Sequence, residues 1–214
     1  MIERIALRAG LAAALFATAL PVLAGAQQEE QLSQSVVYGL SKAIADAPVP
    51  GNYAARPEVE RWIGEMSRRI SHKVDTDRER RELLATAHYE AMRAGLDPQV
   101  VLAVIYHESG FKKYAVSPAQ ARGYMQVMPF WLKQIGSADQ NLFNLRTNLR
   151  YGTVILRHYL DIEGGDYYRA LGRYNGSLGQ AEYPTAVFAA LNRHFAYTAP
   201  APAAIVSVAV PAPR

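Results

Sequence analysis

The sequence of 214 residues contains no cysteine. This absence excludes disulfide bonds, thiolate metal sites and a cysteine nucleophile. It also excludes the modified cysteine that anchors a bacterial lipoprotein after its export signal. We therefore expect a chain whose chemistry depends on other side chains and which no lipid anchors to a membrane.

Long hydrophobic runs are also scarce. Arg4 and Arg8 precede an apolar run over residues 9–20, and small residues follow at 24–26. A run of about twelve apolar residues is shorter than the ~20 that span a bilayer. Basic residues, a short apolar run and a small-residue site are together typical of a secretory signal peptide. We predict that residues 1–26 are such a signal and that the chain is periplasmic, with an uncleaved anchor as the alternative.

The chain has no strong excess of charge of one sign. Its 23 Lys and Arg against 19 Asp and Glu give a formal net charge of +4, which is too small and too evenly spread to indicate nucleic acid. It could favour an anionic polymer such as cell wall. No phosphate loop, nucleophile elbow or dinucleotide fingerprint occurs, and His107 lacks the second histidine four residues on that a zinc-binding helix needs. We predict no cofactor and no metal.

The remaining sequence divides into three parts. Residues 27–56 have weak periodicity and end in Pro48-Val49-Pro50-Gly51-Asn52, which predicts a linker or N-terminal extension with one short helix. Residues 198–214 are rich in Pro and Ala, which is typical of a tail. The single folded domain is therefore predicted at residues 57–197.

Within residues 57–197 the apolar spacing is helical and strand-like alternation is absent, which predicts an all-α fold. Thr76 and Glu79 have the spacing of a capping box, and Gly95 and Gly110 are typical of helix ends. A long loop is expected between Gly110 and Gly123. The predicted helices cover residues 57–70, 76–94, 98–109, 124–134, 147–163, 166–174 and 184–195.

One carboxylate lies where a helix should face the core. Val101, Val104, Ile105 and Glu108 fall at i, i+3, i+4 and i+7. Burial and the negative end of the helix dipole both disfavour the ionised form, so we expect a raised pKa for Glu108, as a general acid requires. The alternative is an ordinary ion pair with a basic residue nearby in sequence, for which the candidates are Lys112, Lys113 and Arg122.

Glu108 is the sole acidic residue between Asp97 and Asp139, in a stretch that is rich in aromatic and neutral hydrogen-bonding side chains. Such a composition suits an oligosaccharide cleft. Ordinary glycosidases use two carboxylates. A single acid could instead protonate the leaving oxygen and then deprotonate a hydroxyl of the same sugar, which attacks its own anomeric carbon. That reaction yields an anhydro sugar and consumes no water.

Three segments carry a resemblance to a known family. They are His-Glu-Ser-Gly-Phe at 107–111, Gly-Tyr-Met-Gln-Val-Met-Pro at 123–129 and Ala-Leu-Gly-Arg-Tyr-Asn-Gly at 170–176. In this order they resemble the motifs of the soluble lytic transglycosylase (SLT) catalytic domain, over roughly residues 80–195. The resemblance implies a lysozyme-like (SLT/goose-type) α fold with a cleft for peptidoglycan glycan strands. It also implies cleavage of the β-1,4 bond between N-acetylmuramic acid and N-acetylglucosamine, leaving a 1,6-anhydro end.

The resemblance also implies roles for individual residues. Glu108 would be the acid/base, and Ser117 would hydrogen-bond its carboxyl group. Gln126 and Met128 would line the sugar subsites. Ser117, which precedes a proline, could otherwise be an ordinary turn serine, and Met128 could simply be a core residue.

Further residues are assigned from the later motif. Tyr174 would orient the carboxylate or the substrate, Asn175 would shape the cleft floor, and Glu182 could match a second acidic residue of the family. Tyr174 could instead be a packing residue, and Glu182 a solvated one. Tyr124 and the pair at 121–122 depart from the smaller residues usual in the family, which puts the substrate preference in doubt. A hydrolytic muramidase and a non-catalytic wall-binding component are the alternative functions.

Overall fold

The computed structural model describes residues 27–45 and 48–199. The predicted signal, residues 1–26, and residues 200–214 of the predicted tail lie outside this range. The described residues form helices and isolated β-bridges, which confirms the all-α prediction. The elements in chain order are α1 (Gln34–Ile44), η1 (Tyr53–Ala55), α2 (Pro57–Arg69), α3 (Asp77–Arg93), α4 (Pro98–Ser109), α5 (Phe130–Ile135), α6 (Leu145–Ile162), α7 (Tyr167–Asn175), α8 (Glu182–Ala190) and the π-helical turn η2 (Leu191–Phe195).

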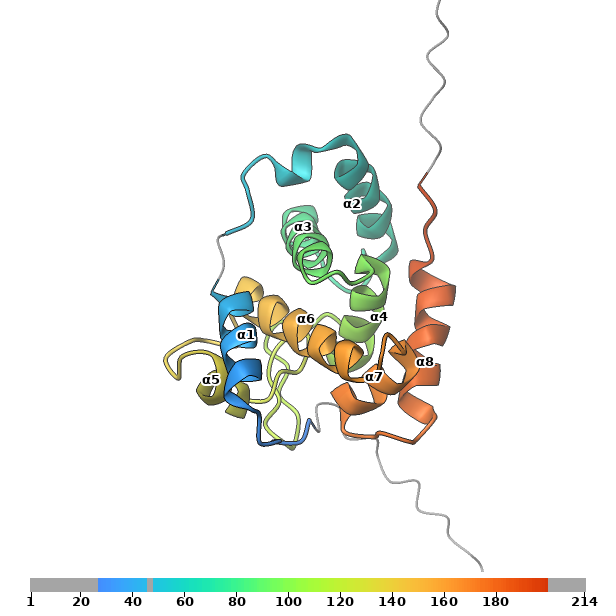
Figure 1. Ribbon diagram of the computed structural model, residues 1–214. Helices are drawn as coiled ribbons and strands as arrows, with labels where there is room; N and C mark the ends of the chain where they lie inside the picture. Colours follow the sequence, from blue (N-terminus) through green and yellow to red (C-terminus); the bar gives the residue numbers. More distant parts are fainter. Residues whose placement is uncertain (1–26, 46–47, 200–214) are drawn as a thin grey trace, which may run out of the picture.

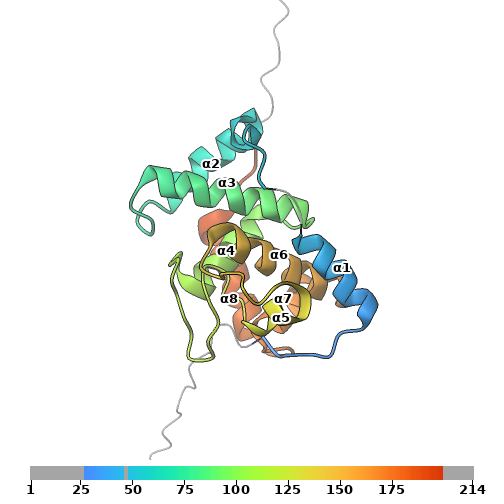
Figure 2. The same cartoon turned by 90° about the vertical axis from the view of Figure 1, so that its left-hand side faces the viewer.

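The helices pack around α4 and α6. Helix α6 contacts α1, α3 and α7, and α4 contacts α3, α8 and η2. Two views at right angles show α2 and α3 at one end of the molecule and α5, α7 and the lower part of α8 toward the other (Figures 1 and 2). The end of α4 therefore lies between the α7–α8 pair and the long loop that follows it.

Local sequence signals fix the ends of α3 and α4. The Thr76 hydroxyl accepts a hydrogen bond from Glu79 N at 3.2 Å, which is the first contact of a capping box, and it donates one to Glu79 Oε2 at 2.8 Å. Asp97 Oδ1 accepts from Gln99 N at 2.7 Å at the start of α4. Gly110, at φ +57°, ends α4 in the left-handed conformation that glycine adopts readily. The predicted boundaries of both helices are confirmed within one residue.

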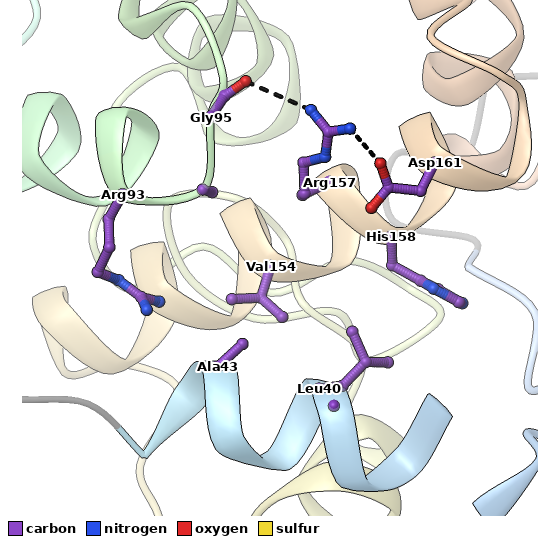
Figure 3. A pocket seen from close by; sticks show the side chains of 10 residues that line it. Leu40, Ala43, Arg93, Gly95, Val154, Arg157, His158 and Asp161 are labelled. Carbon is purple, nitrogen blue, oxygen red and sulfur yellow. Dashed lines mark hydrogen bonds and ion pairs between the residues drawn. The ribbon is translucent and has the colours of Figure 1, made fainter. Parts of the chain in front are cut away.

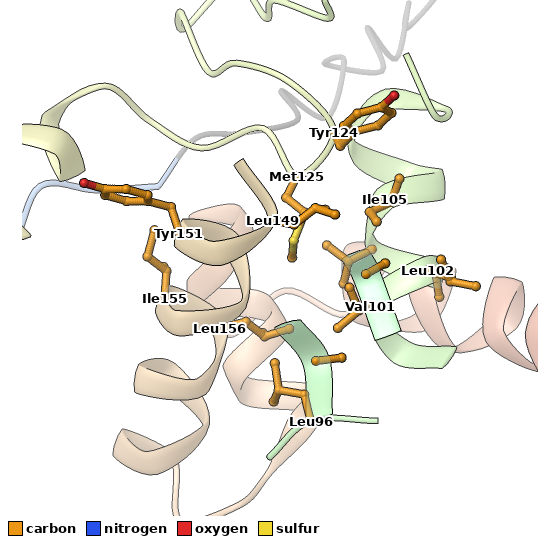
Figure 4. Packing of buried hydrophobic residues seen from close by; sticks show 14 of the residues in the cluster. Leu96, Val101, Leu102, Ile105, Tyr124, Met125, Leu149, Tyr151, Ile155 and Leu156 are labelled. Atoms are coloured by element: carbon orange, nitrogen blue, oxygen red, sulfur yellow. The ribbon is translucent and has the colours of Figure 1, made fainter. Parts of the chain in front are cut away.

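Helix α4 is the central helix of the core. Its residues 100–105 are each at most 4% exposed, so the whole circumference of the helix is buried and not just the predicted stripe. Figure 4 shows Val101, Leu102 and Ile105 of α4 near Met125 of the following loop and Leu149 of α6. On the last turn of α4, Glu108 and Ser109 are buried, whereas Tyr106 and His107 are partly exposed.

The segment predicted as a linker contributes to the packed body. Its expected short helix is α1, which packs against α5 and α6, and Ile44 at its end is buried. The apolar residues of α1 lie on one side of the helix, so packing against α6 removes them from water. Residues 46–47, which precede the Pro48–Asn52 run, lie outside the described range.

The helix predicted at 124–134 is wrong over its first half, because α5 begins only at Phe130. Gly123 (φ +75°) and Gln126 (φ +47°) both adopt the left-handed conformation, which an α-helix cannot contain. Arg122 instead pairs with Val127 in an isolated antiparallel bridge. The segment before α5 is therefore a tight loop.

The last predicted helix, 184–195, is also different in detail. Helix α8 ends at Ala190 and the π-helical turn η2 continues to Phe195, which is buried.

Over the described residues, no helix combines the length and the apolar character needed to cross a membrane.

Candidate active site

Glu108 lies in the last turn of α4 and is 6% exposed. Its Oε1 accepts a hydrogen bond from the Tyr183 hydroxyl at 2.5 Å. Its Oε2 has no hydrogen-bond partner among the described residues. Within the same residues Glu108 makes no ion pair, so the alternative of pairing with Lys112, Lys113 or Arg122 is wrong for this structure.

Burial raises the pKa of Glu108 from 4.5 to about 8, although the Tyr183 hydroxyl and the Asn175 amide both act to lower it. The location at the C-terminal end of α4 acts in the same direction as burial. Glu108 is therefore mainly a neutral carboxylic acid at pH 7, and such a group can donate a proton to a leaving oxygen.

Tyr183 is the partner of this carboxyl group, and sequence reasoning missed it. It lies in the first turn of α8, 75 residues from Glu108, and is 5% exposed. Burial first, and then the charge of Glu108, raise the pKa of its hydroxyl well above 10, so the hydroxyl remains a donor. Nothing in the sequence near Tyr183 indicates this contact, because it depends on how α8 packs against α4.

Asn175 ends α7 beside the same carboxyl group. It is 2% exposed, and Gly176, at φ +78°, fixes the end of the helix there. Its amide lowers the pKa of Glu108, which places the two groups close together. In the described part of the chain, Asn175 Nδ2 has no hydrogen-bond partner, as is true of Glu108 Oε2. The Asn175 amide and the Glu108 carboxyl group are therefore buried neighbours that are not joined by a hydrogen bond of ordinary length.

Tyr174 supports the loop and not the carboxyl group. Its hydroxyl, fully buried, donates to the carbonyl of Met125 at 2.7 Å. Burial and the charge of Glu108 raise its pKa, so it neighbours Glu108 without bonding to it. Of the two roles predicted for Tyr174, the contact with the carboxylate is made by Tyr183. The role in orienting the substrate stays a prediction.

Ser117 does not make the predicted hydrogen bond to Glu108. Its hydroxyl accepts from Ala121 N at 3.1 Å, and its own N–H donates to the Ala121 carbonyl at 3.1 Å. These contacts agree with the alternative interpretation of Ser117 as an ordinary turn serine. Ser117 thus closes the loop that forms one wall of the site.

Gln126 holds the same loop from the other side. Its Nε2 donates to the carbonyls of Ala115 at 3.1 Å and Gly123 at 2.9 Å, and the side chain is 2% exposed. Met128 is partly buried and packs against the core, as its alternative interpretation predicted. Both residues lie on the loop between α4 and α5, residues 110–129, which is called the site loop below. The side-chain amide of Gln126 is hydrogen-bonded to backbone carbonyls of this loop.

Asn148 of α6 holds the loop before α5 in place, and this role was not predicted from the sequence. Its Oδ1 accepts from Met125 N at 2.8 Å, and its Nδ2 donates to the carbonyls of Arg122 and Leu142 at 2.8 and 2.9 Å. A Cβ on Gly123 would lie 2.4 Å from Asn148 Nδ2. Glycine is therefore required at this position for packing as well as for its positive φ.

Glu182 is exposed at the first position of α8. A carboxylate there interacts favourably with the positive end of the helix dipole. No hydrogen bond or ion pair joins it to Glu108 within the described residues. The structure thus leaves Glu182 beside the site residue Tyr183 and does not bring its carboxylate to the acid.

A cavity of about 540 Å³ lies elsewhere, between α1, the end of α3 and α6 (Figure 3). None of the predicted site residues lines it, and its lining contains no Tyr, Trp or Phe on which a sugar ring could stack. Arg157 pairs there with Asp161 and donates to the Gly95 carbonyl at 3.5 Å. This cavity does not contribute to the site at Glu108.

The residues that the structure describes include no group of three or more His, Asp or Glu side chains that could hold a metal ion. The chemistry proposed below uses only protein side chains.

These features define a class of protein. A helical domain with a buried acid at the end of its central helix, facing neutral hydrogen-bonding side chains, is a lysozyme-like domain. Residues 86–187 match the family described as the Transglycosylase SLT domain.

A relative from Enterobacteria phage PRD1, named "Transglycosylase", is similar to part of the chain. The two are 33% identical over 112 residues, which cover 49% of this chain and 41% of the phage protein. The chain therefore spans less than half the length of this relative.

Proposed function

We propose that the protein is a peptidoglycan lytic transglycosylase with Glu108 as its sole acid/base. It cleaves the β-1,4 bond between N-acetylmuramic acid and N-acetylglucosamine and leaves a 1,6-anhydro end. The observation that carries the proposal is the solitary, buried acid. Its one direct hydrogen-bond partner among the described residues is the neutral Tyr183 hydroxyl, and no ion pair joins it to another residue there.

The first step uses the protonated form of Glu108. Its proton passes to the glycosidic oxygen, the N-acetylglucosamine side leaves, and positive charge develops at the anomeric carbon of the muramic acid. Glu108 is then a carboxylate in a buried site. The Tyr183 hydroxyl, at 2.5 Å from Oε1, and the nearby Asn175 amide stabilise this charge.

The second step restores the acid. The Glu108 carboxylate removes the proton from the C6 hydroxyl of the same muramic acid, and the C6 oxygen bonds to the anomeric carbon. The proton donated in the first step is thereby recovered, and no water enters. A two-carboxylate mechanism would need a second carboxylate on the other face of the sugar. Among the predicted site residues the other carboxylate is Glu182, which is exposed at the start of α8.

The product distinguishes this reaction from hydrolysis. When purified sacculi are digested with the protein, we expect mass spectrometry to find muropeptides with anhydro ends, each lighter by one water than the reducing form. Reducing ends alone would contradict the proposed reaction and indicate a muramidase. Binding to sacculi without release of any muropeptide would indicate a wall-binding component.

Replacement of Tyr183 tests how the acid is tuned. Tyr183→Phe removes a hydrogen bond to a charged group, worth about 1.5 to 3 kcal/mol, so we expect kcat to fall about 10- to 100-fold. The pKa of Glu108 should rise further, because this bond favours the ionised form. The alkaline limb of the kcat profile should therefore move above its wild-type position near pH 8.

The matched control for that change is Tyr168→Phe, which removes a more exposed hydroxyl that bonds to the Ala181 carbonyl and to Thr185 at 2.9 Å. This control should leave the pH profile unchanged. If kcat fell equally in Tyr183→Phe and Tyr168→Phe, and the alkaline limb of the Tyr183→Phe profile stayed in place, Tyr183 would have a packing role only.

The substrate also suggests where the protein works. Peptidoglycan lies outside the cytoplasmic membrane, so we propose that residues 1–26 direct export and that the chain acts in the periplasm. The SLT domain over residues 86–187 supports an extracytoplasmic site of action.

A further inference from the structure

Gln27 is a polar residue in an unexpected place. It is the first residue of the described chain, yet it is only 3% exposed. Its Oε1 accepts hydrogen bonds from Met128 N and Trp131 Nε1, both at 3.2 Å, and its Nε2 donates to the Gln126 carbonyl at 3.3 Å. The carboxamide is thus held by three groups from one short stretch of the site loop and α5.

This stretch adjoins the proposed acid. Tyr174 of α7 connects the two, because it directly precedes Asn175, the neighbour of Glu108. Its hydroxyl donates to Met125, the residue just before this stretch. Gln27 therefore lies in the region where the resemblance places the sugar subsites.

The three groups around Gln27 match an acetamido group. An N-acetyl sugar presents a carbonyl oxygen, which can accept two hydrogen bonds, and an N–H, which can donate one. Met128 N and Trp131 Nε1 supply the two donors, and the Gln126 carbonyl supplies the acceptor. The carboxamide of Gln27 has the same arrangement of oxygen and N–H about one carbon, so it satisfies groups that would otherwise be buried without partners.

We propose that Gln126, Met128 and Trp131 form an acetamide-binding subsite, which the N-terminal arm, residues 27–33, occupies through Gln27 until an N-acetyl sugar displaces it. This inference rests on the proposed function in that it takes an N-acetyl glycan as the ligand. It does not depend on whether the cleavage yields an anhydro or a reducing end.

Beyond Gln27 the arm is held by the partly buried Leu32, which packs against the core next to α1, and by two polar contacts. Residues 28–31 are exposed. Gln134 Nε2 donates to the Glu30 carbonyl at 2.9 Å, and Arg173 pairs with the Glu30 carboxylate at 3.4 Å, both at the surface. Exposed ion pairs and solvated backbone bonds open readily. The arm can therefore leave the subsite while α1, which packs against α5 and α6, stays in place.

A binding experiment tests the competition directly. In a Glu108→Gln background, which prevents turnover, calorimetry would measure the affinity for tri-N-acetylchitotriose with and without Gln27→Ala. The substitution removes the carboxamide that competes with the sugar. We therefore expect the affinity for tri-N-acetylchitotriose to rise about 10-fold, because the subsite is no longer occupied in the free protein. The matched control Gln31→Ala, an exposed residue of the same arm, should leave it unchanged.

A probe on the arm gives a second readout. Because the chain contains no cysteine, Glu29→Cys introduces a single site for a spin label. We expect saturating tri-N-acetylchitotriose to increase the mobility of this label. An unchanged or weaker affinity in Gln27→Ala, a label that stays immobile while the sugar binds, or no sugar binding by any variant would each overturn the proposal.

These outcomes differ from a failure of the proposed function. Sacculi digested to reducing ends alone would refute the transglycosylase reaction, yet the competition between Gln27 and the sugar would still be measurable. Anhydro products together with an affinity unaffected by Gln27→Ala would support the reaction and refute the occupied subsite.

Discussion

Glu108→Gln is expected to slow the release of muropeptides from sacculi by about 10³- to 10⁴-fold, the contribution of an acid/base that acts in both steps. Glutamine keeps the shape of the side chain, and its carbonyl oxygen can still accept from Tyr183. It carries no ionisable proton, so it can neither protonate the leaving oxygen nor accept a proton from the C6 hydroxyl. The rate is followed as soluble muropeptide released over time.

The control for this loss is Glu58→Gln, which makes the same change at an exposed residue of α2. It should keep wild-type activity. Lysis by Glu108→Gln at a rate near that of the control would refute Glu108 as the acid, provided that both proteins are folded.

The same substitution has a consequence for stability. The folded-state pKa of Glu108, about 8, lies above its ordinary value of 4.5. Between these values the folded protein binds more protons at this site than the unfolded chain, so stability falls as the pH rises through the window. Glu108→Gln removes this penalty. Above pH 8 the unfolding free energy of the variant should therefore exceed that of wild type by on the order of a few kcal/mol, and its melting temperature should be higher. The two proteins should differ least below pH 4.5.

Calorimetric melting of both proteins across this pH range would measure the difference. Melting temperatures that run parallel from pH 4.5 to pH 9 would mean that Glu108 titrates normally. Such a result would remove the physical basis for its action as an acid at neutral pH.

Local signals allowed much of the fold to be predicted. The capping box at Thr76 and Glu79, and the glycine that ends α4 at Gly110, satisfy backbone groups of their own helices, so short-range pattern is enough to place them. The same holds for Glu108, whose spacing from Ile105 and Val104 predicted its burial. Where neighbouring residues determine the conformation, it can be predicted from a short stretch of sequence.

The parts that were not predicted depend on distant contacts. The loop before α5 reads as helix from its apolar spacing, but Asn148 of α6 accepts from Met125 N, and Gln126 takes a positive φ. The Tyr183 hydroxyl reaches Glu108 across 75 residues. The burial of Gln27 beside Trp131 spans 104 residues. None of these pairings has a local pattern, because each results from how packed elements meet.

A second large effect is expected far from the acid, at a buried ion pair. Glu90 of α3 and Arg150 of α6 are 0% and 3% exposed, and two hydrogen bonds of 2.8 Å join them. Glu90→Gln would remove the carboxylate charge with which both Arg150 and Arg93 pair at this buried position. We expect a loss of about 3 to 5 kcal/mol of unfolding free energy, measured by denaturant titration.

The chain offers a matched control in Glu60 and Arg81, which join α2 to α3 through two hydrogen bonds of 2.6 and 2.7 Å at the surface. Glu60→Gln should cost less than about 1 kcal/mol, because water screens an exposed pair. Equal losses in the two variants would show that the buried position of Glu90 does not matter.

The buried pair also connects to the N-terminal arm. Arg150 donates to the carbonyl of Ile44, the last residue of α1, at 3.3 Å. Loss of the Glu90 charge should therefore loosen the docking of α1 on α6 before the rest of the core unfolds. Since α1 carries the arm that inserts Gln27, Glu90→Gln should also raise the affinity for tri-N-acetylchitotriose at temperatures where the protein remains folded. Wild-type sugar affinity in this destabilised variant would show that the arm is held independently of α1.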